Sequence, residues 1–98
     1  MITTQSIVVA APDQVSSDLA GEAVILNLGT GMYYGLDEVG ARVWSLVQQP
    51  CAVEALRDTI LAEYEVDPER CERDLLDLLA DLEAARLVEV AEQSAKGS

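Results

Sequence analysis

The fold is decided by residues 22–44, EAVILNLGTGMYYGLDEVGARVW. The apolar run that follows Glu22 is typical of a β-strand, because aliphatic and β-branched side chains dominate it. Residues 29–31 are Gly-Thr-Gly, a tight connector whose glycines adopt positive φ without steric cost. Residues 32–36 resume an extended pattern, so the two segments predict a β-hairpin. From Asp37 the apolar spacing becomes helical, and the Asp37 carboxylate is placed to accept hydrogen bonds from the first-turn amides.

A further strand is predicted upstream of the hairpin. Ile7–Ala10 is a short β-branched run that ends at the turn signal Pro12-Asp13. Residues 14–17 are polar and are interpreted as a connection. We therefore expect Ile7–Ala10 to join the hairpin in a three-stranded antiparallel meander.

Three helices are predicted after the hairpin. The first runs from Asp37 to Pro50, and Gly40 inside it indicates that another backbone packs closely there, because glycine costs about 1 kcal/mol relative to alanine in a helix. The third begins at Asp67-Pro68, an acidic N-cap with proline at the first helical position, and runs to about Ala85. The second is predicted by an apolar stripe at helical spacing, formed by Val53, Leu56, Ile60, Leu61 and Tyr64.

The remaining segments are short. Residues 87–90 are predicted to be extended, and residues 93–98 are expected to form a flexible polar tail. A chain of 98 residues fits a single domain, 1–98, with about 5–90 ordered. The predicted fold class is α+β, with a three-stranded antiparallel sheet packed on a three-helix bundle.

The charge of the chain disfavours several partners. Six Lys and Arg against 18 Asp and Glu give a formal net charge of −12. Nucleic-acid affinity comes largely from cationic side chains that displace counterions, and anionic membranes attract basic segments, so neither is an expected partner. An acidic field favours a basic peptide or protein by speeding encounter.

A small sheet followed by three helices is also the architecture of a winged helix-turn-helix DNA-binding regulator. The third helix would then read the major groove, yet residues 67–83 carry two arginines and seven carboxylates. Such a helix is repelled by DNA. A regulator of this kind is the competing functional class, with DNA binding disfavoured, and a structural subunit of a larger enzyme is a third.

The sequence lacks residue sets for catalysis or metal binding. There is no His, and the two cysteines, Cys51 and Cys71, are twenty positions apart without a CxxC pair. Cys71 lies on an apolar helix stripe and is interpreted as a core thiol, which fits a reducing compartment. Without His or a CxxC pair, we expect a non-catalytic chain without cofactor or metal. No basic residue precedes Arg42, as a signal peptide would require, and no apolar run approaches ~18 residues, so we expect a cytoplasmic chain.

The predicted third helix has two contrasting faces at 100° per residue. Its apolar line consists of Cys71, Leu75, Leu78 and Leu82. Its opposite flank carries Asp74, Asp77 and Asp81. This acidic flank is interpreted as a solvated helix face, and the alternative is that some of its carboxylates meet basic side chains of a bound peptide.

Residues 32–36 form the segment with a candidate binding role. At the edge of a sheet, the free N–H and C=O groups of this strand would be a template for an added strand. Side chains alternate along a strand, so Met32, Tyr34 and Leu36 share one face and Tyr33 and Gly35 the other. Tyr34 and Leu36 are interpreted as core, and Tyr33 as either an exposed aromatic without a role or a contact residue.

Residues 26–44 resemble the signature of PqqD-like proteins, the leader-peptide recognition elements of ribosomal peptide natural-product (RiPP) pathways. The similarity continues through the helix after Pro50 and the Tyr64–Pro68 junction, and it spans about residues 5–90. It includes the Leu-rich third helix that ends in Arg86-Leu87-Val88. Arg86 departs from the family pattern, in which a glycine is expected to close this helix.

The resemblance implies a three-stranded sheet packed on a winged helix-turn-helix-like trio of helices, with no catalytic activity. It further implies that an extended leader peptide binds as a fourth antiparallel strand against the third sheet strand, in a groove beside the third helix. Carried onto this chain, the peptide-binding residues are Met32, Tyr33, Tyr34, Gly35, Leu36, Cys71, Asp74, Leu75 and Leu78.

In its small size and its excess of acidic residues, the chain is most similar to the stand-alone leader-binding protein of lasso-peptide biosynthesis. The resemblance then implies three partners: the leader of a precursor peptide, a separate cysteine-protease leader peptidase and an ATP-dependent cyclase that closes the ring. The alternative within the family is a PqqD-type peptide chaperone for a radical-SAM maturase.

Overall fold

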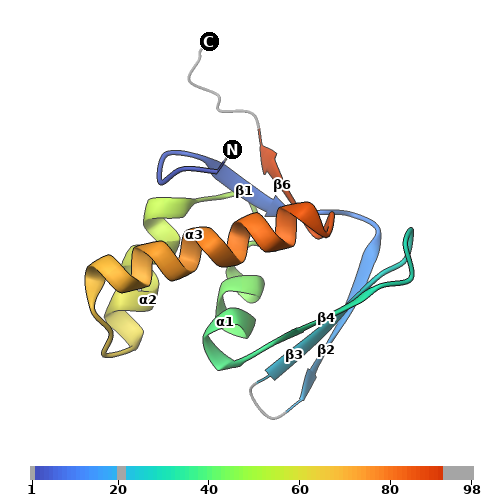
Figure 1. The fold of residues 1–98 in the computed structure, drawn as a ribbon, viewed down its shortest axis with the longest axis horizontal. Coiled ribbons are helices and arrows are strands. Elements are labelled where there is room, and N and C mark those ends of the chain that lie inside the picture. The colour runs from blue at the N-terminus through green and yellow to red at the C-terminus, as the bar shows by residue number, and fades with distance from the viewer. Residues whose placement is uncertain (1, 20–21, 92–98) are drawn as a thin grey trace.

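A computed structural model describes residues 2–19 and 22–91, and the predicted tail, 93–98, lies outside the described residues. The fold is α+β, as predicted, with three helices and two small antiparallel sheets (Figure 1). The elements in chain order are β1 (Ile7–Ala10), β2 (Gln14–Leu19), β3 (Glu22–Asn27), β4 (Tyr33–Leu36), α1 (Glu38–Leu46), β5 (Cys51–Ala52), α2 (Val53–Glu63), α3 (Pro68–Ala84) and β6 (Val88–Ala91).

The two sheets have the strand orders β2-β3-β4 and β5-β1-β6. The predicted hairpin is confirmed as β3–β4, but the prediction that Ile7–Ala10 completes its sheet is wrong. Ile7–Ala10 pairs instead with β5 and with β6, where Val9 lies opposite Glu89. The third strand of the hairpin sheet is Gln14–Leu19, so the interpretation of residues 14–17 as a connection is also wrong. The backbone of this strand pairs with β3, while Val15, Ser16 and Ser17 are exposed, so no apolar alternation marks it as a strand.

Both predicted helix starts are confirmed. The Asp37 Oδ1 accepts a hydrogen bond from the Gly40 N–H at 2.8 Å, and Asp67 caps α3 by accepting from the Arg70 N–H at 3.0 Å. The expected reason for Gly40 is corrected: a Cβ there would lie 3.2 Å from atoms of the Leu36 side chain, and not against another backbone. Gly40 therefore leaves room for Leu36, the last residue of β4.

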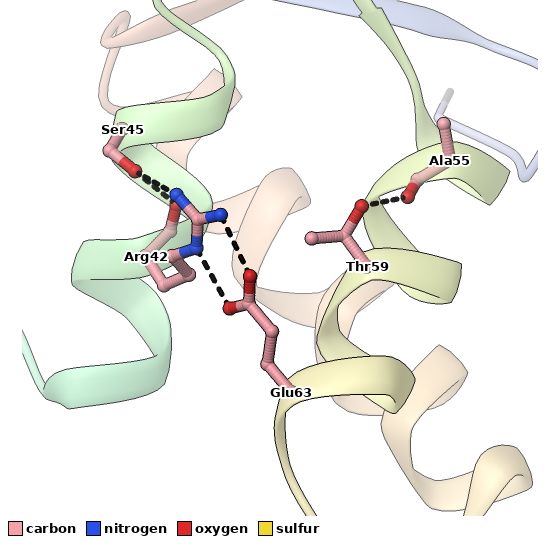
Figure 2. A network of polar contacts seen from close by, with 5 residues as sticks. All are labelled: Arg42, Ser45, Ala55, Thr59 and Glu63. Atoms are coloured by element: carbon pink, nitrogen blue, oxygen red, sulfur yellow. Dashed lines mark hydrogen bonds and ion pairs between the residues drawn. The ribbon is translucent and has the colours of Figure 1, made fainter.

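The helices enclose a single apolar core with the inner faces of both sheets. Its fully buried side chains include Val8, Ile25, Leu56, Leu79 and Leu82. At the surface, Arg42 of α1 donates from Nε and Nη2 to the two carboxylate oxygens of Glu63 of α2, both at 2.8 Å (Figure 2). A planar guanidinium matches a carboxylate at two points, and because both side chains are partly exposed this contact supplements the core packing between α1 and α2.

The end of α3 is closed without a glycine. Arg86 has φ 62°, in the left-handed region, the Leu87 N–H donates to the Leu82 carbonyl at 2.8 Å, and the Arg86 N–H donates to the Glu83 carbonyl at 3.0 Å. This pair of bonds is the Schellman pattern that normally uses glycine. The buried Asn27 at the end of β3 adds hydrogen bonds from Nδ2 to the carbonyls of Ala85 and Arg86. The final turn therefore has the backbone conformation that usually takes glycine, with arginine at that position.

Replacing this arginine is expected to stabilise the protein. A side chain in the left-handed region costs about 1 kcal/mol, so Arg86→Gly should raise the melting temperature by about 4–8 °C for a domain of this size. Calorimetry of Arg86→Gly and Arg86→Ala measures the effect, because alanine keeps the Cβ that causes the strain. Equal melting temperatures for the two variants would contradict this account of the turn.

Candidate functional site

A groove of about 780 Å³ lies beside β4 and is bounded by α1 and by the first half of α3. Figure 1 shows β4 leading directly into α1, and α3 crossing in front of α1 and α2 in this view. The lining residues are Tyr34, Gly35, Leu36, Asp37, Val39, Gly40, Val43, Ile60, Glu65, Val66, Asp67, Arg70, Cys71, Asp74, Leu75 and Leu78. An edge strand, a helix start and a helix face thus meet around one hollow.

The strand that borders this groove is the last in its sheet, and among the described residues no strand pairs with its second edge. The Asn27 N–H donates to the Met32 carbonyl at 2.9 Å, and Tyr34 lies opposite Ile25. Since hydrogen-bonded pairs alternate along an antiparallel ladder, Tyr34 turns its backbone groups toward β3. Tyr33 and Gly35 therefore turn their N–H and C=O groups toward the groove edge.

Seven of the nine residues predicted to bind a peptide line the groove: Tyr34, Gly35, Leu36, Cys71, Asp74, Leu75 and Leu78. Met32 and Tyr33 do not line it. Met32 precedes β4 and is 66% exposed, and the Tyr33 side chain, 72% exposed, projects from the sheet face opposite the helices. Met32 is therefore not buried together with Leu36.

The groove has an apolar floor that sequence reasoning found only in part. Leu36, Ile60, Leu75 and the start of α1 form this floor, and all belong to the protein's core. The α1 side could have been found from Val39 and Val43, which are one helical turn apart. The loop side, Glu65–Asp67, gives no periodic signal, because it connects two helices.

The rim of the groove is acidic. Its charged lining residues are Asp37, Glu65, Asp67, Arg70 and Asp74. The Arg70 Nε lies 3.7 Å from the Asp74 Oδ2, and both side chains are well exposed, so water screens this pair. Four carboxylates against one guanidinium leave a negative potential over the opening.

Two titratable groups in the groove stay protonated at neutral pH. Burial raises the pKa of Tyr34 above its usual 10.0, and the charge of Asp81 and a hydrogen bond to it raise this pKa further. Burial, and next Asp74, raises the pKa of the Cys71 thiol, although Arg57 acts in the opposite direction. A protonated, buried thiol is a poor nucleophile.

Residues 2–19 and 22–91 contain no group of three or more His, Cys, Asp or Glu side chains that could hold a metal ion. In the same part of the chain, no helix is long and apolar enough to cross a membrane. The groove presents backbone hydrogen-bonding groups, apolar side chains and surface carboxylates.

Comparison with known proteins gives three results. Residues 22–88 match the family described as Coenzyme PQQ synthesis protein D (PqqD), and a search of curated proteins finds no match. The solved structure of TbiB1 in complex with the TbiA(beta) leader peptide is similar at 41% sequence identity, with a TM-score of 0.78 over 87% of this chain and 99% of that chain. A lasso peptide synthetase B1 complexed with the leader peptide shares the fold at 20% identity, with a TM-score of 0.73 over 84% and 96% of the two chains. The family match spans more than half of the sequence, and the chain therefore belongs to the PqqD family.

Proposed function

We propose that this chain binds the leader segment of a ribosomally made precursor peptide in lasso-peptide biosynthesis, without catalysing a reaction itself. The observation that carries the proposal is the open edge of β4 beside an apolar groove. It is supported by the 41% identity to TbiB1, whose structure holds a leader peptide. The second solved structure, which shares the fold, is a lasso peptide synthetase B1 with its leader peptide, and we therefore favour a lasso pathway over a radical-SAM maturase as the setting.

The leader would bind as a fourth antiparallel strand along β4. Tyr33 and Gly35 each offer one N–H and one C=O to the added strand, and main-chain hydrogen bonds of this kind supply affinity that depends little on sequence. Leader side chains opposite Tyr34 and Leu36 would point into the groove, since side chains alternate along a strand. The apolar floor then selects leaders with apolar residues at alternate positions.

The energetics suit a carrier that must also release its peptide. Delivery calls for a Kd between about 1 nM and 1 μM, or about −12 to −8 kcal/mol. Ordering a disordered leader costs about 2–5 kcal/mol of the gross interaction energy. Two or three apolar side chains buried in the groove contribute about 1.5–3 kcal/mol each, and with the edge hydrogen bonds they offset that cost.

The acidic rim of the groove favours a basic leader peptide. It disfavours the alternative function, in which α3 would bind DNA as a recognition helix. The wall that α3 presents to the groove includes Asp74, and Glu65 and Asp67 lie just before its start. Exposed charges of this kind mainly change the association rate of an oppositely charged partner. They would also repel a phosphate backbone.

Delivery to a leader peptidase and a cyclase requires a second surface that stays free while the groove is filled. The face of the β2-β3-β4 sheet opposite the helices, here called the outer sheet face, offers such a surface on β2 and β3, away from the β4 edge. There Val15, 51% exposed, lies opposite Leu26 in one cross-strand row. An apolar row of this kind suits protein contact. We assign it to the leader peptidase, whose substrate is held at the adjacent edge.

Removing an edge donor is expected to weaken leader binding. Gly35→Pro deletes the Gly35 N–H, which points away from β3, so the hydrogen bonds between β3 and β4 are kept. The added strand loses one hydrogen bond, because the leader carbonyl opposite Gly35 no longer has a donor. A labelled TbiA(beta) leader peptide should bind at least about tenfold more weakly in fluorescence anisotropy.

Ser16→Pro is the matched control, because the same alternation turns the Ser16 N–H outward on β2, at the opposite edge of the sheet. This variant should bind normally. Normal affinity in folded Gly35→Pro would refute strand addition at β4.

Reversing a rim charge is expected to slow capture of a basic leader. Asp74→Lys should reduce the association rate of a lysine-rich leader peptide by about threefold or more at low salt, and the deficit should shrink as salt screens the charges. Stopped-flow fluorescence measures the rate. Asp77→Lys, on the same helix but outside the groove lining, serves as the control. Equal rates for the two variants would mean that the rim does not steer the peptide.

A charge on the outer sheet face is expected to impair hand-over without affecting leader binding. Val15→Glu should lower the rate of leader removal by the separate peptidase about tenfold, because it buries a carboxylate in the proposed contact. Val90→Glu, at a similarly exposed valine (40%) of the other sheet, should process normally. Normal processing with Val15→Glu would exclude this face as the peptidase contact.

A further inference from the structure

We propose that the leader residue paired with Gly35 is aromatic, and that its ring lies over Gly35 on the outer sheet face, against Val24 and Tyr33. This inference rests on the proposed function and adds a specificity-determining position to it. The groove selects the leader side chains that point inward. The site at Gly35, here called the glycine notch, would select the side chain that points outward between them.

The notch is an open position on an otherwise apolar face. Gly35 follows Tyr34 in a strand whose exposure alternates, so its missing side chain belongs to the outer sheet face. A Cβ built at Gly35 has no heavy atom within 4 Å apart from those of its chain neighbours. Val24 lies directly opposite on β3, and Tyr33 is the other β4 residue on this face. Both are exposed, at 37% and 72%.

The backbone does not require glycine at this position. Among the glycines of the described residues, Gly31 has positive φ, at 76°, and Gly35 does not. Glycine inside a strand is destabilising, and here it occupies one of only four residues in β4. A glycine that is neither forced by the backbone nor crowded by a neighbour commonly marks the close approach of a ligand or a second backbone.

The register of an added strand brings one leader side chain over the notch. Gly35 turns its N–H and C=O toward the groove edge, so it forms a hydrogen-bonded pair with a leader residue, and paired side chains project from the same sheet face. An aromatic ring at that leader position has no opposing side chain and can lie flat across Gly35. It also reaches the diagonal neighbours, about 7–8 Å away, which a short aliphatic side chain does not.

An aromatic residue on the neighbouring strand that covers a glycine is known to restore the stability of a β-sheet. The ring would cover the bare Gly35 backbone and remove the exposed parts of Val24 and Tyr33 from water. The recognised leader therefore carries apolar residues opposite Leu36 and Tyr34, with an aromatic residue between them.

A library of random displayed peptides, selected on the full-length chain, tests the inference whatever the sequence of the natural leader. The best selected peptide is then added to the isotope-labelled protein for NMR. We expect amide shifts at Tyr33 and Gly35, with large upfield ring-current shifts of the Gly35 Hα and Val24 methyl protons. Substituting that aromatic residue by alanine should weaken binding about tenfold and abolish the upfield shifts.

Filling the notch on the protein side provides the matched test. Gly35→Val should still fold, since its side chain enters open space, and it should bind the aromatic peptide and the alanine peptide with affinities within about threefold of each other. Ser17→Val, in the same cross-strand row but on β2, should retain the full preference for the aromatic peptide.

The selected peptides could shift the Tyr33 and Gly35 amides and yet show neither an aromatic preference nor upfield shifts. This result would contradict aromatic selection at the glycine notch and leave strand addition intact. A selection that gives no peptide shifting these amides would overturn the proposed function itself.

Discussion

The free edge of β4 is the constraint on which the other features of the site depend. Backbone polar groups need partners, and Tyr33 and Gly35 turn theirs away from the sheet. Water can satisfy them in the free chain, and a further strand can satisfy them in a complex. Because β4 has four residues and leads at once into α1, this template is short. A short edge limits indiscriminate strand pairing, so selectivity has to come from the groove beside it.

The groove exists because α3 is held at a fixed distance from that edge. Asn27 donates to the carbonyls of Ala85 and Arg86, while its Oδ1 accepts from the amides of Gly29 and Thr30. One buried side chain thus joins the hairpin turn to the end of α3. At the other end, Gly40 lets Leu36 fit against α1. These contacts orient the edge and the helix before a peptide arrives, which lowers the ordering cost of binding.

Features encoded locally can be predicted from the sequence, and those that depend on distant pairing cannot. Asp37 and Asp67-Pro68 mark helix starts by their own chemistry, and residues 29–31 mark the hairpin. By contrast, β2 is exposed at Val15, Ser16 and Ser17 and has no apolar period. The partners of Ile7–Ala10, β5 and β6, lie far along the chain, and no local signal identifies them. Periodicity and resemblance together identify four groove residues on the third helix, whereas Tyr33 faces the opposite side of the sheet.

Hydrogen exchange at the amides of Tyr33 and Gly35 tests the central claim most directly, since it reports the hydrogen bonding of the edge itself. The account predicts fast exchange of both amides in the free protein and strong protection once a leader peptide is bound, with the Ser16 amide unchanged. Protection of Tyr33 and Gly35 already in the free protein, or their continued fast exchange in the saturated complex, would contradict it.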